Sequence, residues 1–508
     1  MLENPSEPVP QPVAFPRSRR RSLLVVPCAM LLVGMAVLVE FFPLEGLEAY
    51  QDRSAPELVL GRDAVTSRNA ALIRMGLLQM SHKYCEPEDL AAFSKEAVAL
   101  FKQPCPAPAA ALLEQGSPPS TALLASRVAA LPADTVVISL VCRSSELFDP
   151  DHGIVTHPLE HNREAERPAW FSAWQKSRLL IESPIGLRIH GGHSRTLPAK
   201  SFGLRFREEY GGYETGPAGL FFGEDAPPLR ELVLSNADHP SRFNAALATE
   251  IAALAGCKVS RCVPAIVFLN GTEIRSPFFL YEHQSPDFVE GRFGMADVEW
   301  VRLKSREPVE NEAYIEWRRW VRRPRNPILM EEEAAKFNLQ DLNAWVLAMS
   351  FTATGDNNQG AYFRDRRNPQ AVWQSLVWDM DWAFDEGVHQ TAQGPLRPST
   401  DSFEVLLGDR ARLFNRLFDN NAEYRQTYQQ FVRERLSTEL SRETVLKLMD
   451  RYESLASRHP SSSPKLMAVM KTTRAFLERR HAEYEVLLED RVREALSAAR
   501  EPRPLAER

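Results

Sequence analysis

The chain has 508 residues, with 44% hydrophobic and 25% charged side chains, a mixture typical of a globular protein that buries a core. Its net charge is −6, from 61 basic and 67 acidic residues. This balance lacks the basic excess of a general nucleic-acid binder, so we expect no nucleic-acid partner. The length corresponds to roughly two to four domains.

The N-terminus carries the pattern of a membrane anchor. Residues 1–22 are polar and rich in proline and end in a cluster of arginines, and the segment from Leu23 to Val39 is uncharged. Phe41 and Phe42 extend it to the length of about 17–25 residues that a membrane helix needs. Because flanking arginines stay in the cytoplasm, we expect a cytoplasmic tail over 1–22 and a transmembrane signal anchor over 23–43. The protein would then be a single-pass protein of the cell membrane with its C-terminal domain outside the cytoplasm. A cleaved signal peptide, which also exports the body, and a buried core helix are the alternatives.

Residues 44–130 alternate short helical patterns with proline-rich breaks, which indicates a membrane-proximal region ending near residue 130. In an oxidising compartment Cys85 could pair with Cys105 and Cys257 with Cys262, leaving Cys142 free, but the connectivity is not fixed by the sequence. A zinc site is not expected at Cys257 and Cys262, because they lack a neighbouring CxxC pair and a nearby pair of histidines.

The rest of the chain begins with strands and continues with helices. DTVVISLVCR, ELVLSN and AIVFLNGTEI read as strands, the last with an Asn-Gly hairpin turn, and PSRFNAALATEIAALAG reads as a helix that ends at Gly256. Four later segments have helical periodicity: EEEAAKFNLQDLNAWVLAMSF, AEYRQTYQQFVRERLS, SRETVLKLMDRYESLAS and PKLMAVMKTTRAFLERRHAEYEVLLEDRVREALSAA. We therefore expect an α+β protein with a strand-rich lobe over 131–310, a helical lobe over 311–495 and a loose tail over 496–508. Two-lobed chains often hold a site in the cleft between the lobes.

One candidate phosphate site is the hairpin LRIHGGHSRTLPAKSFGLRFR. Its loop contains Gly191 and Gly192, which let backbone N–H groups approach an anion closely. A row of basic side chains accompanies the loop: Arg188, Arg195, Lys200 and Arg205. Phosphate is the natural guest of such a patch, although a plain hairpin is the alternative. His190 and His193 straddle the turn without a third ligand, so we expect no metal there.

A pair of acids lies in VWQSLVWDMDWAF, which reads as a strand. The period of two would put Asp379 and Asp381 on one face and their apolar neighbours on the other. Neighbouring carboxylates on a buried strand repel each other unless a cation lies between them, and Mg²⁺ is the ordinary partner. The alternative is that one acid caps a helix and the other pairs with an arginine.

Asp356, Asn357, Asn358 and Gln359 form a polar loop about twenty residues before these acids. An aspartate there can accept the proton of an acceptor hydroxyl, and an amide neighbour such as Asn358 can complete a metal shell. A simple Asx turn is the alternative. Around this site, Glu282 is a candidate partner of Lys200, and Lys304 is a second candidate phosphate cation.

Taken together, these stretches resemble the CotH family of atypical kinases, first associated with spore coats. The motifs appear in the family's order over roughly residues 134–495: LFDPDHGIV, ERPAWF, LRIHGGHSRTLPAKSFGLRFREEYG, ELVLSNADHPSRFNAALATEIAALAG, VFLNG, FFLYEHQ, GDNNQGAYFRD and VWDMDWAF. Residues 1–130 find no counterpart.

The resemblance implies a divergent, two-lobed protein-kinase-like fold that binds ATP and Mg²⁺ or Mn²⁺ and phosphorylates serine or threonine. Lys200 matches the lysine of the family's P-K-K-S motif, with Ala199 in place of the preceding lysine. Asp356 matches the catalytic aspartate, and Asp379 matches the metal-binding aspartate, which Asp381 would support. Glu282 matches the glutamate that follows the hairpin. The loop DNNQG departs from the family pattern, which puts a metal ligand at Asn358 in doubt.

Three classes of function remain open at this point. The first is a membrane-anchored kinase acting on a protein of the cell envelope or coat. The second is an inactive CotH-like binding protein of the cell surface, and the third is a metal-dependent hydrolase that uses the acid pair.

Overall fold

The computed structural model describes residue 95 and residues 135–161, 163–238, 240–303, 311–322, 330–355, 357–384, 390–391, 394–395, 403, 406–458 and 464–500. All of them belong to one compact unit of the chain. The predicted cytoplasmic tail, the predicted anchor over 23–43 and all but one residue of the region 44–130 lie outside this described part. Within it, every helix is too short or too polar to cross a membrane.

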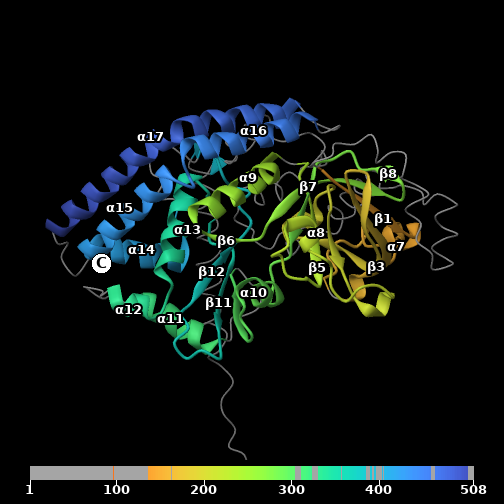
Figure 1. Cartoon of the computed structure of the whole chain (residues 1–508), viewed down its shortest axis with the longest axis horizontal. Helices are drawn as coiled ribbons and strands as arrows, with labels where there is room; N and C mark the ends of the chain where they lie inside the picture. Colours follow the sequence, from red (N-terminus) through yellow and green to blue (C-terminus); the bar gives the residue numbers. More distant parts are fainter. Residues whose placement is uncertain are drawn as a thin grey trace, which may run out of the picture. The chain divides into compact units, whose positions relative to one another are not determined.

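A sheet of eight strands forms the first half of the described chain (Figure 1). In spatial order the strands are β1 (Val136–Cys142), β2 (Arg167–Gln175), β3 (Arg178–His190), β4 (Ser201–Arg205), β5 (Glu231–Asn236), β9 (Phe278–Glu282), β7 (Cys262–Leu269) and β8 (Thr272–Glu273). Strand β1 also pairs in parallel with β7, so the sheet closes on itself as a barrel. The sequence predicted strands here but not the closure.

The barrel closes around an apolar interior because its strands alternate. Leu187, Ile189 and Phe202 are almost fully buried inside, while Arg188 and His190 take the opposite face. The predicted Asn-Gly turn is confirmed: Asn270 and Gly271 both have positive φ angles, and they join β7 to β8. Antiparallel pairing of β3 with β4 leaves the loop 191–200 at one end of the barrel.

A second, four-stranded sheet has the order β10 (Val298–Arg302), β11 (Ala361–Asp365), β12 (Gln374–Val377) and β6 (Lys258–Val259). Two of its strands precede residue 310 and two follow it. The strand-rich and helical parts of the chain are therefore joined by backbone hydrogen bonds, not only by a connecting segment.

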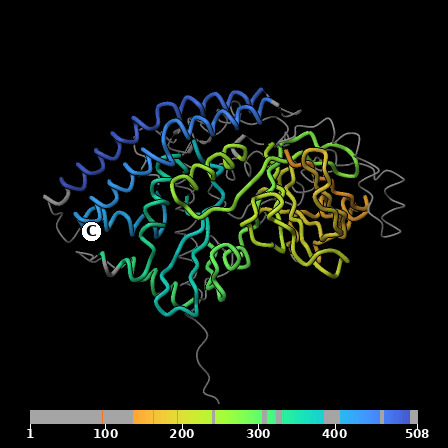
Figure 2. Tube along the Cα trace, in the orientation of Figure 1, coloured from red at the N-terminus to blue at the C-terminus, as the bar shows by residue number. Residues whose placement is uncertain are grey.

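Helices follow in the later part of the chain (Figure 2), and they contribute most of a second hydrophobic core. The long helices are α9 (Pro240–Ala255), α11 (Glu312–Arg322), α13 (Leu339–Phe351), α14 (Gly408–Asn420), α15 (Ala422–Ser437), α16 (Arg442–Arg458) and α17 (Pro464–Arg500). Short elements complete the list: α7 (Ser144–Phe148), α8 (Gly219–Phe222), α10 (Pro286–Phe293), α12 (Met330–Ala334), β13 (Gln390–Thr391), β14 (Gly394–Pro395) and 3₁₀ turns at Arg163–Ala165, His193–Thr196 and Glu208–Tyr210. The expected α+β architecture, with strands first and helices later, is confirmed.

One local prediction was wrong, and one possible disulfide is not formed. The single helix predicted over 331–351 is two helices, because Phe337 bridges to Trp373 and Asn338 caps a new helix, its Oδ1 accepting the N–H of Asp341 at 3.1 Å. Cys257 and Cys262 are not bonded to each other, and the Cys142 thiol donates a hydrogen bond to the Pro168 carbonyl at 3.4 Å. Cys257 follows α9, whereas Cys262 opens β7; Cys85 and Cys105 lie outside the described residues.

Candidate active site

The two acids lie in a turn that follows β12. The strand ends at Val377, and Asp379 has a φ of 62°, a left-handed conformation in which the alternation of a strand is lost. The prediction that Asp379 and Asp381 share one face of a strand was therefore wrong. The apolar neighbours are nevertheless turned inward: Met380 is 1% exposed, and Trp378 stacks on Trp300 with ring centres 6.1 Å apart. Asp379 is exposed and Asp381 half-buried.

Arg242, on the first turn of α9, is the cation on which both acids act. Burial lowers the pKa of its guanidinium from the ordinary value, and the attraction of Asp381, then of Asp379 and Asp238, opposes that shift. Its Nη1 donates a hydrogen bond to the Asn236 carbonyl at 3.1 Å, which fixes the side chain at the end of β5. Asp379 and Asp381, from the later half of the chain, thus interact electrostatically with Arg242, from the earlier half.

Lys200 lies next to this group. Phe202 pairs with Leu234, so continuing the register by two residues places Lys200 opposite Asn236. The ammonium is fully buried and donates to the Arg195 carbonyl at 2.6 Å. Burial, and then repulsion by Arg195 and Arg242, lowers the pKa of Lys200 to about 7. Lys200 and the acid pair are therefore linked electrostatically through Arg242.

The other predicted cations have different roles. Arg195 is 4% exposed and donates to the carbonyls of Gly191 (2.6 Å), Pro158 (3.1 Å) and Glu160 (3.0 Å), so it braces the glycine loop. In that loop Gly191 has a φ of 119°, where a side chain would be strained and would meet Ser194, while Gly192 is exposed with open space beside it. Lys304 lies outside the described residues.

The predicted ion pair between Lys200 and Glu282 is not formed. Glu282 is fully buried, pairs with Arg292 of α10 and accepts the backbone N–H of Arg261 at 2.7 Å. Its side chain is committed to the junction between β9 and α10. Lys200 therefore depends on Arg195 and Arg242, not on a carboxylate, for its electrostatic setting.

The polar loop meets the acidic turn through its backbone. The N–H of Gly355 donates to the Trp382 carbonyl at 3.1 Å, and the N–H of Phe384 donates to the Thr352 carbonyl at 2.8 Å. Asp356 itself lies outside the described residues, but its preceding neighbour is tied to the residue that follows Asp381. The predicted association of the two segments is thus present in the fold.

Arg410 holds the other side of this loop, and the sequence analysis missed it. Its fully buried guanidinium lies 4.3 Å from the centre of the Trp345 ring and donates to the carbonyls of Asn357 and Gln359 at 3.1 and 2.9 Å. The side-chain amide of Asn357 donates to the Thr354 carbonyl and accepts the N–H of Leu407, so both of its ends are engaged within the protein. Asn358 packs its side chain against Gly408.

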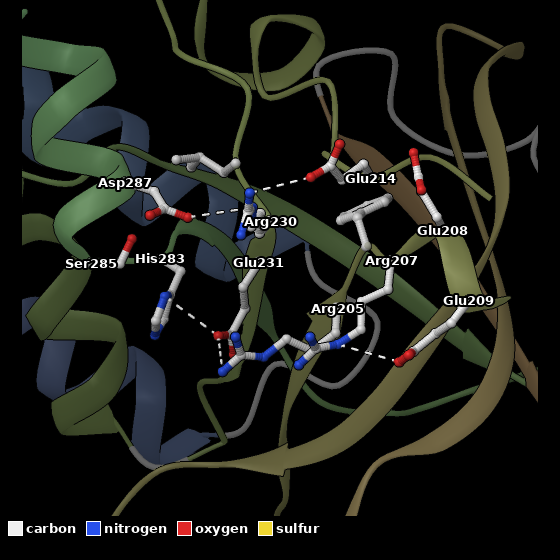
Figure 3. Close-up of a pocket in the computed structure, with 12 residues that line it drawn as sticks. Arg205, Arg207, Glu208, Glu209, Glu214, Arg230, Glu231, His283, Ser285 and Asp287 are labelled. Carbon is white, nitrogen blue, oxygen red and sulfur yellow. Dashed lines mark hydrogen bonds and ion pairs between the residues drawn. The ribbon is translucent and has the colours of Figure 1, made fainter. Parts of the chain in front are cut away.

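A cavity of about 470 Å³ lies at the opposite end of β4 and β5 (Figure 3). Its floor is Glu231, a 2% exposed carboxylate that pairs with Arg205, with Arg188 at 3.3 Å and with His283 at 3.4 Å. Two members of the basic row predicted beside the glycine loop, Arg188 and Arg205, thus pair with one buried acid. Gly203 leaves room for this cluster, since a methyl group there would meet Glu231 Oε1 at 2.6 Å.

The donor set fits Mg²⁺ that is shared with a nucleotide. In the described part of the chain, three or more histidine, cysteine, aspartate or glutamate side chains nowhere gather as a complete metal cage. Mg²⁺ does not require one, because it is usually held by one or two carboxylates, with phosphate and water completing the shell. Asp379 and Asp381, two residues apart on one turn, offer that kind of partial shell.

Comparison with known proteins agrees with the motifs. The family model described as CotH kinase protein matches residues 187–304 and 297–489. The crystal structure of the Helicobacter pylori proinflammatory kinase CtkA is similar over 53% of this chain and 92% of its own, with 11% identity and a TM-score of 0.27. No curated protein matches this chain. Because the family model spans most of the described residues, including Lys200, Arg242 and both acids, the chain belongs to the CotH kinase protein family.

Proposed function

We propose that this protein is an atypical protein kinase that binds ATP with Mg²⁺ or Mn²⁺ and phosphorylates serine or threonine of an envelope or coat protein. The observation that carries the proposal is that Arg242 bonds to the end of β5 opposite Lys200, where the charges of Asp379 and Asp381 also act on it. Cationic side chains near two carboxylates suit a phosphate chain and its divalent ion. A divergent kinase-like arrangement and an N-terminal membrane anchor that exports the body belong to the same proposal.

The roles of the side chains follow from their chemistry. Lys200, in its charged form, would contact the phosphates beside the loop of Gly191 and Gly192, and Asp379 with Asp381 would hold the divalent ion. That ion neutralises charge on the transferred group. Asp356 would take the proton of the acceptor hydroxyl. The hydroxyl oxygen would bond to the γ-phosphorus of ATP, and the bond between that phosphorus and the oxygen of ADP would break, so that ADP leaves. Positioning and charge neutralisation then supply most of the acceleration.

An inactive binding protein on the same fold is the second candidate. It is favoured by the missing pair between Lys200 and Glu282, whose partner is Arg292 instead. Thermal stabilisation by ATP with Mg²⁺ together with phosphate transfer supports the kinase, whereas neither would be seen with an inactive surface protein. Release of free phosphate from many esters, without a protein acceptor, would instead indicate a hydrolase.

The decisive test uses the full-length protein, labelled ATP, Mg²⁺ or Mn²⁺ and cell-envelope protein, with phosphosites located by mass spectrometry. Asp379→Ala should lower phosphate transfer by more than about 100-fold. The variant would lose a ligand of the divalent ion, and without that ion the negative charge of the phosphates is no longer balanced. Asp297→Asn, a surface aspartate paired with Arg366 at 3.3 Å, serves as the matched control and should retain activity. Undiminished autophosphorylation of a folded Asp379→Ala protein would overturn the assignment.

A further inference from the structure

Arg242 lies beside the proposed phosphate site, because it bonds to Asn236, the residue opposite Lys200. It is carried by α9, yet the acids whose charges act on it belong to the turn after β12, well over a hundred residues later. Its own charge acts in turn on Lys200. The guanidinium is therefore under the influence of charges of both signs.

A buried hydrogen-bond network at the end of β5 holds the Arg242 side chain in its orientation. Its Nη1 bonds to the Asn236 carbonyl. The fully buried Asn236 side chain accepts from the Asp238 N–H at 2.9 Å and from the Ser276 hydroxyl at 2.8 Å. The backbone N–H of Asn236 donates to the Ser201 hydroxyl at 2.9 Å. Ser201 directly follows Lys200. The strand end that positions the lysine therefore also positions the arginine.

This placement has a definite electrostatic consequence. Two carboxylates on one short turn repel each other, and a nearby positive charge relieves that repulsion. Arg242 provides such a charge without a metal ion. A divalent ion arriving alone would be repelled by the guanidinium, whereas an ion arriving with phosphate would bring an anion for which guanidinium is an excellent partner.

We propose that Arg242 is a nucleotide-binding residue: its guanidinium balances Asp379 and Asp381 before ligands arrive and contacts the nucleotide's phosphates once they bind. The inference rests on the proposed function, since it takes a nucleoside triphosphate with its divalent ion as the ligand. It makes the site selective for the ion and nucleotide together, because the same side chain disfavours the bare ion and favours the anion.

The test measures two ligands separately by isothermal titration calorimetry on the full-length protein. Arg242→Gln should bind Mn²⁺ alone about 3- to 10-fold more tightly, because a positive charge near the acids is gone. The same variant should bind ATP in EDTA about 10- to 100-fold more weakly, because an arginine contact to phosphate is lost. Arg242→Lys should keep the wild-type affinity for Mn²⁺ and lose only part of the affinity for ATP.

Arg319→Gln, which removes an exposed arginine of α11, is the matched control and should leave both affinities unchanged. Melting temperatures identify any variant that fails to fold, in which case Arg242→Lys carries the test. Weaker binding of both Mn²⁺ and ATP, or an unchanged Mn²⁺ affinity in folded Arg242→Gln, would overturn the inference. Neither result would affect the proposed kinase activity, which is measured by phosphate transfer in the wild type. Opposite shifts in a protein that never transfers phosphate would support the inference and reject the kinase.

Discussion

Lys200 is a lysine whose chemistry departs far from that of its free form. Its ammonium has no exposed surface, and two arginines repel its charge. Burial and this repulsion lower the pKa of Lys200 to about 7, although the Arg195 carbonyl accepts a hydrogen bond from the ammonium. The lysine is therefore partly neutral at physiological pH until an anion stabilises its charge.

Nucleotide binding should consequently take up a proton. With a pKa of about 7 before binding and a raised pKa beside phosphate, Lys200 should take up about 0.9 proton at pH 8 but only about 0.1 at pH 6. Calorimetric titrations of ATP in buffers of different ionisation enthalpy measure this number. Lys200→Met should abolish the difference between the two pH values. Equal proton uptake at both pH values in the wild type would show that Lys200 is charged before binding.

Candidate site residues can be picked out from sequence where the signal is local. Lys200, Asp379 and Asp381 were chosen because a basic loop and an acid pair stand out against their neighbours, and their roles stay predictions. Arg242 was missed because its partners are far away in the chain, and a single arginine at a helix start resembles a solvated charge. Glu282 was misassigned because pairing with Arg292 depends on how α10 folds back onto β9.

At the scale of elements, caps decide where helices begin. The acceptor side chain of Asn338 satisfies a free N–H of α13 and separates that helix from α12. Because α13 runs directly into residues 352–355, this cap sets the start of the element that delivers the polar loop. A helical sequence pattern through 331–351 does not reveal the break.

Asn338→Ala should lower the free energy of unfolding by about 1 kcal/mol, since the cap hydrogen bond is lost. Urea denaturation followed by circular dichroism measures the change. Gln340→Ala, an exposed position on the same helix, should change it by less than about 0.5 kcal/mol. Equal effects of the two substitutions would argue against the capping role.

Strand prediction was reliable where the period of two continued and failed where the backbone turned. AYFRD and ELVLSN form strands with the expected bounds. WDMDW alternates just as well, yet the left-handed conformation of Asp379 ends the strand there. That conformation is sustained by contacts on both sides of the turn, among them the stacking of Trp378 on Trp300, which local sequence does not encode.

At the scale of the molecule, α17 supports both halves of the candidate site. It bonds to α9 through Thr473 and Asn244 at 3.1 Å and to the end of α13 through Arg480 and the Phe351 carbonyl at 2.7 Å. The hydroxyls of Tyr484 and Ser350 lie 2.7 Å apart. Helix α9, which carries Arg242, and helix α13, which leads to the polar loop, are thus both held by α17.

A chain that ends at residue 463 should lose the fold of the second core. Helix α17 buries several large apolar side chains, each contributing about 1.5–3 kcal/mol, and their sum approaches the whole stability of a typical domain. The far-UV helical signal should fall by more than the share of the 37 residues removed with the helix. A chain ending at residue 500 is the control. If the helical signal fell only by the share of those residues and ATP binding stayed intact, α17 would not be needed to support the candidate site.

The closed barrel restricts how another protein can be recognised. Extended peptides often dock by adding a strand to an open sheet edge. Here β7 is hydrogen-bonded to β1 along one side and to β9 and β8 along the other, so the two-residue β8 is the open edge among the described strands of the barrel. A polypeptide substrate of the proposed kinase would therefore be selected by side chains and loops around the candidate site, and its backbone conformation would be unconstrained by this sheet.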